Sequence, residues 1–361
     1  MRPGPSTSPR ALARALHAGI LALAALLALF AVAPGDSSAA PPAPPAAPSS
    51  SSPAHRGSKP AKHGKKHPHP RVKAVARKPP PAPPPPPLDG ASYDYDYDGH
   101  DTGHPERRWL GRAFVHKKAA ALTRQALPVL VFLHGNNAEA IKYRWMGGGS
   151  EGDIRRIVSE MIEAGQIPPM IVAAPSSVDP VTMTNAGLSW PGFDLDLFLD
   201  RTAERLGPAA VIDRGRVVVA AHSGGGCNIH GGLNTAMHAK GTPVLAGLSI
   251  DTCMMLDLAK ELAHLPRATN VVVSWQAISW PEREFGAFKT VFLRESKKAP
   301  PDPGVLRELD FVQPNVPSPH DALVGITLRK WLPRLLSPPV DGADAGATTG
   351  TTGGGTAAGG G

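Results

Sequence analysis

The chain has 361 residues, with 38 Lys and Arg side chains against 30 Asp and Glu side chains, which gives a formal net charge of +8. The basic excess lies near the N-terminus: residues 55–78 hold six Lys, three Arg and no acid, whereas from residue 89 onward 26 basic side chains face 29 acidic ones. Because residues 55–78 also lack the Phe, Tyr and Trp rings on which bases stack, the composition argues against a nucleic-acid-binding protein.

The first 33 residues are predicted to direct export. Three Arg side chains precede an apolar stretch at 19–33, and the Ala-Val-Ala sequence at 31–33 fits the small-x-small pattern of a signal-peptide cleavage site. Pro34 follows directly and is unfavourable for cleavage, so a cleaved signal peptide and an uncleaved N-terminal anchor both stay open. The predicted localisation is secreted or in the cell envelope.

Two further segments have the composition of disordered chain. Residues 34–88 consist mainly of Pro, Ala, Ser, Lys and His, and residues 341–361 contain no aromatic, Leu, Ile or Val side chain. Such segments bury too little apolar surface to offset conformational entropy. The basic linker either contacts an anionic envelope or cell-wall polymer or is a solvated spacer, and its His residues lack a second ligand cluster, so no metal site is predicted. Residues 89–340 then form one predicted domain.

An alternating aromatic and acidic run, YDYDYDGHD, stands at 93–101, at the start of this domain. Alternation with a period of two residues is typical of a strand with one buried face. An acidic patch that binds a cation or the basic tail, and a plain linker, fit the same residues. Three interpretations of this run therefore stay open.

From residue 127 onward, short apolar runs alternate with amphipathic segments. The expected strands are LPVLVFLHG (127–135), MIVAAPS (170–176), RVVVAAHS (216–223), PVLAGLSID (243–251) and NVVVSWQ (270–276). Expected helices cover 152–165, 193–207 and 320–336, where apolar residues recur every three or four positions. This alternation predicts an α/β fold with a mostly parallel central sheet and helices on both of its faces.

The polar residues of interest follow these strands. Parallel sheets bind ligands at the carboxyl ends of their strands. The sequence HGNN at 134–137 ends the first strand, Ser223 ends the third and Asp251 ends the fourth, while His320 begins the last helix. The third strand continues as VVVAAHSGGG, so Ser223 stands between a buried strand and a run of glycines. This position fits a nucleophile in a tight turn better than a serine in an ordinary Gly-rich loop.

On these residues the chain resembles the α/β-hydrolase superfamily, over about residues 109–336. The superfamily's nucleophile elbow is a strand-to-helix turn with the pattern Gly-x-Ser-x-Gly, and this chain has Ala-His-Ser-Gly-Gly at 221–225. The alanine keeps the small side chain that the turn needs. The chain order of serine, acid and histidine also agrees. HGNN, WPGFDLDLF and AHSGGG further resemble segments of secreted esterases of the feruloyl esterase and polyhydroxybutyrate depolymerase kind.

The resemblance implies a serine hydrolase, most simply a carboxylic-ester hydrolase, that acts on a small-molecule or polymer ester without a cofactor. Ser223 is expected to attack and His320 to accept and return the proton, with His134, His222 and His230 in structural positions. The backbone N–H groups of Gly224 and Asn136 are expected to bind the oxyanion. A peptidase or amidase on the same fold and a non-catalytic envelope-binding protein are the alternatives.

Two residues, Asp251 and Glu282, are candidates for the acid that orients His320. Asp251 ends a strand, whereas Glu282 follows the next strand, where most members of the superfamily carry their acid. Two cysteines of an exported protein usually pair, and a bond between Cys227 and Cys253 would tie the turn after Ser223 to the loop after Asp251. That bond favours Asp251, with two buried thiols as the alternative.

Overall fold

The computed structural model describes residues 86–97, 109–122, 124–179, 182–278 and 282–337, without the side chains of residues 282 and 283. All of these residues lie within the unit Pro81–Gly361. The predicted leader, nearly all of the predicted linker and the predicted C-terminal tail at 341–361 lie outside the described residues. Within the described ranges, no helix combines the length and the apolar character needed to cross a membrane.

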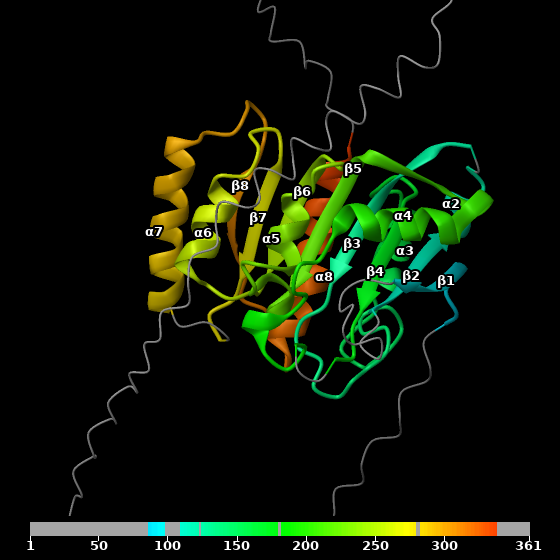
Figure 1. Ribbon diagram of the computed structural model, residues 1–361, viewed down its shortest axis with the longest axis horizontal. Coiled ribbons are helices and arrows are strands. Elements are labelled where there is room, and N and C mark those ends of the chain that lie inside the picture. The colour runs from blue at the N-terminus through cyan, green and yellow to red at the C-terminus, as the bar shows by residue number, and fades with distance from the viewer. Residues whose placement is uncertain (1–85, 98–108, 123, 180–181, 279–281, 338–361) are drawn as a thin grey trace, which may run out of the picture. The chain divides into compact units, whose positions relative to one another are not determined.

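Eight strands form one sheet, in the order β1-β2-β4-β3-β5-β6-β7-β8 (Figure 1). The pairs β1/β2 and β2/β4 are antiparallel, and every other neighbouring pair is parallel. The predicted α/β fold, with its mostly parallel central sheet, is confirmed. The strands are β1 (Gly90–Tyr97), β2 (Trp109–His116), β3 (Ala126–Leu133), β4 (Ile171–Ser176), β5 (Val211–His222), β6 (Val244–Ile250), β7 (Asn270–Trp275) and β8 (Arg307–Phe311).

Helices cover both faces of this sheet. They are α2 (Lys117–Ala120), α3 (Ile154–Glu163), α4 (Leu195–Leu206), α5 (Gly232–Met237), α6 (Leu256–Ala263), α7 (Glu282–Lys298) and α8 (Pro319–Leu336). Apolar side chains of α3 and α8 share one core with the sheet, and those of α4, α5, α6 and α7 share the other. The predicted arrangement of helices on both faces is therefore confirmed.

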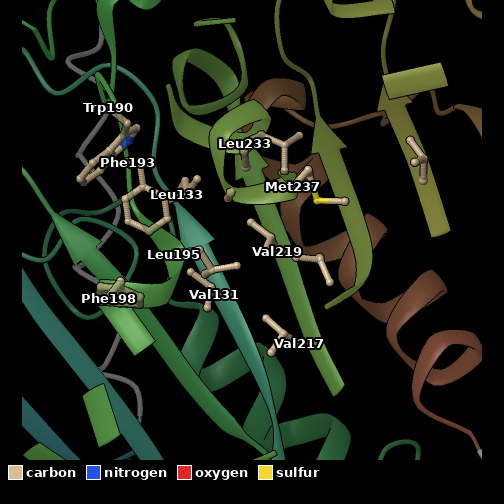
Figure 2. Close-up of a cluster of buried hydrophobic side chains, with 14 of the residues drawn as sticks. Val131, Leu133, Trp190, Phe193, Leu195, Phe198, Val217, Val219, Leu233 and Met237 are labelled. Atoms are coloured by element: carbon tan, nitrogen blue, oxygen red, sulfur yellow. The ribbon is translucent and has the colours of Figure 1, made fainter. Parts of the chain in front are cut away.

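Alternation along the central strands generates the two cores. Val131 and Leu133 of β3 point to the core of α4 and α5, where they lie with Phe198 and Met237 (Figure 2). Phe132, between them in the chain, points to the opposite core of α3 and α8. Because both faces of these strands are buried, the strands read as continuous apolar runs rather than as alternating ones.

Helix α3 shows how local sequence fixes an element. The side chain of Asp153 accepts a hydrogen bond from the Arg155 backbone N–H and caps the helix at its start. Ile154, Val158 and Met161 then recur at helical spacing and are buried. The cap places the start of α3 at the end of the loop that follows β3, and this loop carries part of the site.

The YDYDY part of the alternating run, residues 93–97, belongs to an edge strand, β1, while residues 98–101 lie outside the described residues. Tyr97 is fully buried, and its hydroxyl donates to the Asp194 backbone oxygen at 2.9 Å. The Tyr95 hydroxyl oxygen lies 2.6 Å from Thr202 Oγ1, within hydrogen-bond distance. Asp94 points the other way and binds Arg112 of β2. Of the three interpretations of this run, the edge strand describes its first half.

Candidate active site

Ser223 occupies a sharp turn directly after β5. Its φ of +54° lies in the left-handed region, which non-glycine residues adopt mainly where the surroundings force it. The turn is tightly packed, because a Cβ atom on Gly135 would lie 2.6 Å from the Ser223 Cβ and one on Gly225 would lie 2.5 Å from the Leu133 oxygen. Glycine is therefore required at both positions. Ser223 itself is half-buried at the carboxyl end of its strand.

The nucleophile-elbow pattern implies a helix directly after Ser223, but the described segment has no α-helix at this point. A short 3₁₀ turn, Ser223–Gly226 (η4), follows instead, and α5 begins only at Gly232. Glycine in a helix interior costs about 1 kcal/mol relative to alanine, so three successive glycines disfavour a continuous helix here. His230 accordingly lies in an exposed turn, not on a helix.

The structure brings Asp251 and His320 together. Asp251 follows β6 with a φ of +47° and is fully buried, and its Oδ2 lies 2.6 Å from His320 Nδ1. Gln276 donates a second hydrogen bond to the same oxygen at 2.8 Å. His320 begins α8 with its side chain 32% exposed. The side chain of Glu282, the other candidate acid, lies outside the described part of the structure.

This contact defines the hydrogen positions of the imidazole. A carboxylate can only accept, so His320 Nδ1 carries the hydrogen and Nε2 keeps a lone pair in the neutral ring. A lone pair on Nε2 is the state that a general base needs. The ring is further held against His222, with the ring centroids 4.3 Å apart and the His222 Nε2 3.2 Å from the His320 backbone oxygen.

His134 and His222 are buried, and neither is arranged as a base. Burial lowers the pKa of His134 to about 4, and its Nδ1 lies 2.8 Å from the Gly135 oxygen. Burial, and then the neighbouring His320, lowers the pKa of His222 well below its usual value. Both rings are therefore neutral near pH 7 and pack against Trp190 and Trp145 respectively. These positions agree with the structural roles expected for them.

Gly224 and Asn136, the two expected oxyanion donors, are neighbours. A Cβ atom on Gly224 would lie 3.1 Å from the Asn136 backbone nitrogen and 2.5 Å from its Oδ1. Asn136 is exposed, whereas Asn137 is buried and donates from Nδ2 to the oxygens of Ile141 and Ser177 at 2.9 Å. The buried asparagine therefore fixes the turn that presents the exposed one.

Two residues that contact this site were missed in the sequence. Gln276 binds Asp251, and Arg144 donates from Nη1 to the Asn136 backbone oxygen at 2.6 Å. Gln276 ends an expected strand, and a polar residue at the carboxyl end of a parallel strand could have been recognised as a candidate site residue. Arg144 stands inside a loop without periodicity, and no local pattern marks it.

A disulfide joins Cys227 and Cys253. Cys227 directly follows η4, and Cys253 stands two residues after Asp251. The expected pairing is confirmed, and the alternative of two buried thiols is wrong. The bond ties the segment after Ser223 to the segment after Asp251.

His222, His320 and Asp321 offer nitrogen and oxygen atoms within 4.8 Å of one another. The two imidazole rings pack against each other, with a centroid separation of 4.3 Å and an interplanar angle of 39°. His320 Nδ1 is also occupied by Asp251. The arrangement fits ring packing rather than tetrahedral coordination of a metal ion.

No model of a known protein family and no curated protein matches the sequence. Solved structures with a similar fold include a ferulic acid esterase, with 15% identity over 69% of this chain and 98% of that chain at a TM-score of 0.46. The feruloyl esterase module from Clostridium thermocellum is 13% identical over 70% of this chain and 92% of that chain, at a TM-score of 0.43. An acylaminoacyl peptidase is 14% identical over 71% of this chain and 43% of that chain, at a TM-score of 0.45. The likeness is one of fold.

Proposed function

We propose that this chain is an exported serine hydrolase that cleaves carboxylic esters through an acyl-enzyme on Ser223. The observation that carries the proposal is the 2.6 Å contact between His320 Nδ1 and the buried Asp251 Oδ2, where the His320 ring packs against His222, the residue before Ser223. A serine hydroxyl is a poor nucleophile until a base accepts its proton. An imidazole held in one tautomer by a buried carboxylate is such a base.

The proposed reaction has two halves. Ser223 Oγ attacks the ester carbonyl carbon while His320 Nε2 accepts the hydroxyl proton, and the resulting tetrahedral intermediate expels the alcohol, which takes that proton from His320. Water then attacks the acyl-enzyme with His320 again as base, and the acid leaves as Ser223 regains its hydrogen. Asp251 stabilises the imidazolium in both halves without taking a proton.

The negative charge of each tetrahedral intermediate is assigned to the backbone N–H groups of Gly224 and Asn136. The proposal is supported by the close approach of these two residues, which only a glycine at position 224 allows, because a Cβ there would lie 3.1 Å from the Asn136 backbone nitrogen. Preorganised donors of this kind act on the transition state more than on the bound ester.

Export is proposed from the sequence of residues 1–33 together with the Cys227–Cys253 disulfide. Disulfides persist in oxidising compartments and are rare in the cytosol. The basic linker is proposed to contact an anionic envelope polymer.

A fluorophosphonate probe tests the proposal. Labelling of the full-length protein is expected on Ser223 alone and is expected to vanish in Ser223→Ala. A panel of esters and peptide amides, run on both proteins, then separates an esterase from a peptidase or amidase. Absence of labelling and of turnover in the wild-type protein would point to the non-catalytic envelope-binding alternative.

A further inference from the structure

The loop that connects β3 to α3, residues 134–153, has an unusual backbone. Ala140, Tyr143 and Trp145 have φ values of +52°, +57° and +65°. Non-glycine residues in this region are energetically costly and persist only where surrounding contacts over-determine them. The same loop begins with the turn that carries Asn136, so whatever holds the loop also bears on that turn.

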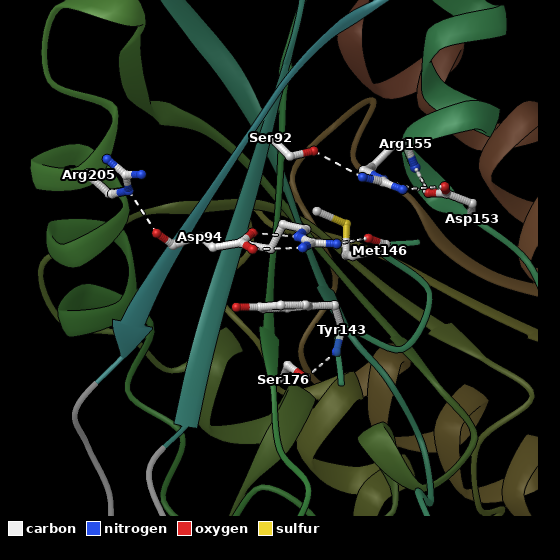
Figure 3. A network of polar contacts seen from close by, with 9 residues as sticks. Ser92, Asp94, Tyr143, Met146, Asp153, Arg155, Ser176 and Arg205 are labelled. Atoms are coloured by element: carbon white, nitrogen blue, oxygen red, sulfur yellow. Dashed lines mark hydrogen bonds and ion pairs between the residues drawn. The ribbon is translucent and has the colours of Figure 1, made fainter. Parts of the chain in front are cut away.

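Tyr143 is the point at which the sheet holds this loop. Its backbone N–H donates to Ser176 Oγ of β4 at 2.7 Å, and the Arg112 guanidinium lies 3.8 Å above its ring (Figure 3). Arg112 also donates from Nη1 to the Met146 backbone oxygen at 2.8 Å. The loop is thereby fixed on both sides of Arg144.

Arg112 is in turn fixed by the edge strand. Asp94 of β1 accepts from Arg112 Nε at 2.5 Å and from Nη2 at 2.7 Å, a bidentate pair (Figure 3). Such pairs set the orientation of a guanidinium as well as its position. This hydrogen bond keeps the pKa of Asp94 below its usual value, so the carboxylate is charged at neutral pH. The alternating run of the N-terminal edge is thus connected to the loop.

Arg144 lies between Tyr143 and Met146 in this loop, and its side chain contacts the candidate site. Its Nη1 donates to the Asn136 backbone oxygen at 2.6 Å, and its Nη2 donates to Glu151 Oε1 at 2.8 Å. The Arg144 side chain is only 16% exposed and that of Glu151 only 18%, so the contact between them is largely shielded from water, while the bond to Asn136 lies at the surface. A planar guanidinium held by a carboxylate is a rigid donor with a defined direction.

We propose that Arg144 is a positioning residue for the oxyanion turn, and that the Asp94–Arg112 pair holds the loop in which Arg144 stands. Fixing the Asn136 carbonyl restricts the backbone dihedrals of that residue and so aims its N–H at the substrate oxygen. This inference rests on the proposed function, because it assigns Asn136 the role of oxyanion donor. Asp94 would then act on the oxyanion turn from the edge strand β1, through Arg112.

The first test is steady-state kinetics of the full-length protein on p-nitrophenyl butyrate. Arg144→Ala is expected to lower kcat by about tenfold or more and to change KM by less than about twofold, since a misaligned donor weakens binding of the transition state. Arg294→Ala removes a guanidinium that is 56% exposed on α7 and is the matched control. It is expected to keep the wild-type kcat.

Chemical rescue separates positioning from a general loss of structure. Guanidinium ion at a non-denaturing concentration is expected to restore part of the kcat of Arg144→Ala, relative to equal NaCl, and to leave Asp251→Asn unchanged. Arg144→Lys keeps the positive charge but not the fork, so it is expected to fall between the wild type and Arg144→Ala. A folded Arg144→Ala variant with wild-type kcat, or one that guanidinium does not rescue, would overturn the inference.

A double variant tests the connection to β1. Asp94→Asn is expected to lower kcat by a smaller factor than Arg144→Ala, and the double variant is expected to lose less than the product of the two factors. Independent losses would overturn the part assigned to Asp94. If the wild-type protein is active and Arg144→Ala has the same kcat as the control Arg294→Ala, only this inference is overturned. If the wild-type protein neither binds the fluorophosphonate nor cleaves esters, the proposed function is overturned as well.

Discussion

The two sides of the candidate site are held in different ways. On the acid side, Asp251 follows a regular strand and His320 begins a regular helix, and one hydrogen bond joins them. On the oxyanion side, Asn136 stands in an irregular loop whose shape depends on contacts with β1, β2 and β4. The acid side is therefore built from element ends, and the oxyanion side from contacts between segments distant in sequence.

This difference determines where substitutions are expected to act. On the acid side, activity should depend on the few residues that touch the imidazole or its carboxylate. On the oxyanion side, it should depend also on residues that never approach the substrate, such as Arg112. A substitution on one side of the site leaves the other side as the internal reference for activity.

The largest expected effect is at Asp251. Asp251→Asn keeps the size of the side chain but removes the carboxylate that fixes the Nδ1–H tautomer, so kcat is expected to fall about 10⁴-fold. Kinetics on p-nitrophenyl butyrate measures the loss, with circular dichroism as a check of folding. Glu282→Gln is the matched control and should stay active. If Glu282→Gln loses activity and Asp251→Asn keeps it, the acid has been assigned to the wrong residue.

On the oxyanion side, Gly224→Ala is expected to have the largest effect. The new methyl group would lie 3.1 Å from the Asn136 backbone nitrogen, which is tighter than ordinary contact, and is therefore expected to push the two donors apart. The kcat is expected to fall roughly 10²- to 10³-fold, the loss typical of one oxyanion donor. Gly286→Ala is the control, because a Cβ there meets nothing within 4 Å. Equal kcat in the two variants would remove Gly224 from the proposed role.

The same contrast explains what the sequence could predict. The five strands β3 to β7, the serine turn and the strand ends that carry Asp251 and Gln276 are visible because buried parallel strands read as apolar runs, whereas β2 was not predicted. Strand β8, with the sequence RELDF, was missed because it is only partly buried and carries three charged residues. The loop at 134–153 has no periodicity, and the bond from Arg144 to Asn136 depends on positive φ values that pattern alone does not indicate.

A pH effect on stability is expected from His134, where the loop begins. Burial lowers its pKa to about 4, against about 6.5 in an unfolded chain. The unfolded state therefore binds more protons between these values, and stability falls as the pH drops from 6.5 to 4, by about 3 kcal/mol in full. Urea unfolding at pH 7 and pH 4.5 measures this loss. His134→Gln should lose less between the two pH values than the wild type, and equal losses would contradict the assignment.

The smallest expected effect, and the sharpest test of the comparison, is at Gln276. Gln276→Leu removes the 2.8 Å hydrogen bond to Asp251 Oδ2 but leaves the bond from His320 in place. Because the imidazole keeps its partner, kcat is expected to fall only about tenfold with KM unchanged, which corresponds to about 1.4 kcal/mol. Gln166→Leu, at an exposed position before β4, is the control. A loss as large as that of Asp251→Asn would show that the acid side also depends on a wider network, and the contrast between the two sides would then disappear.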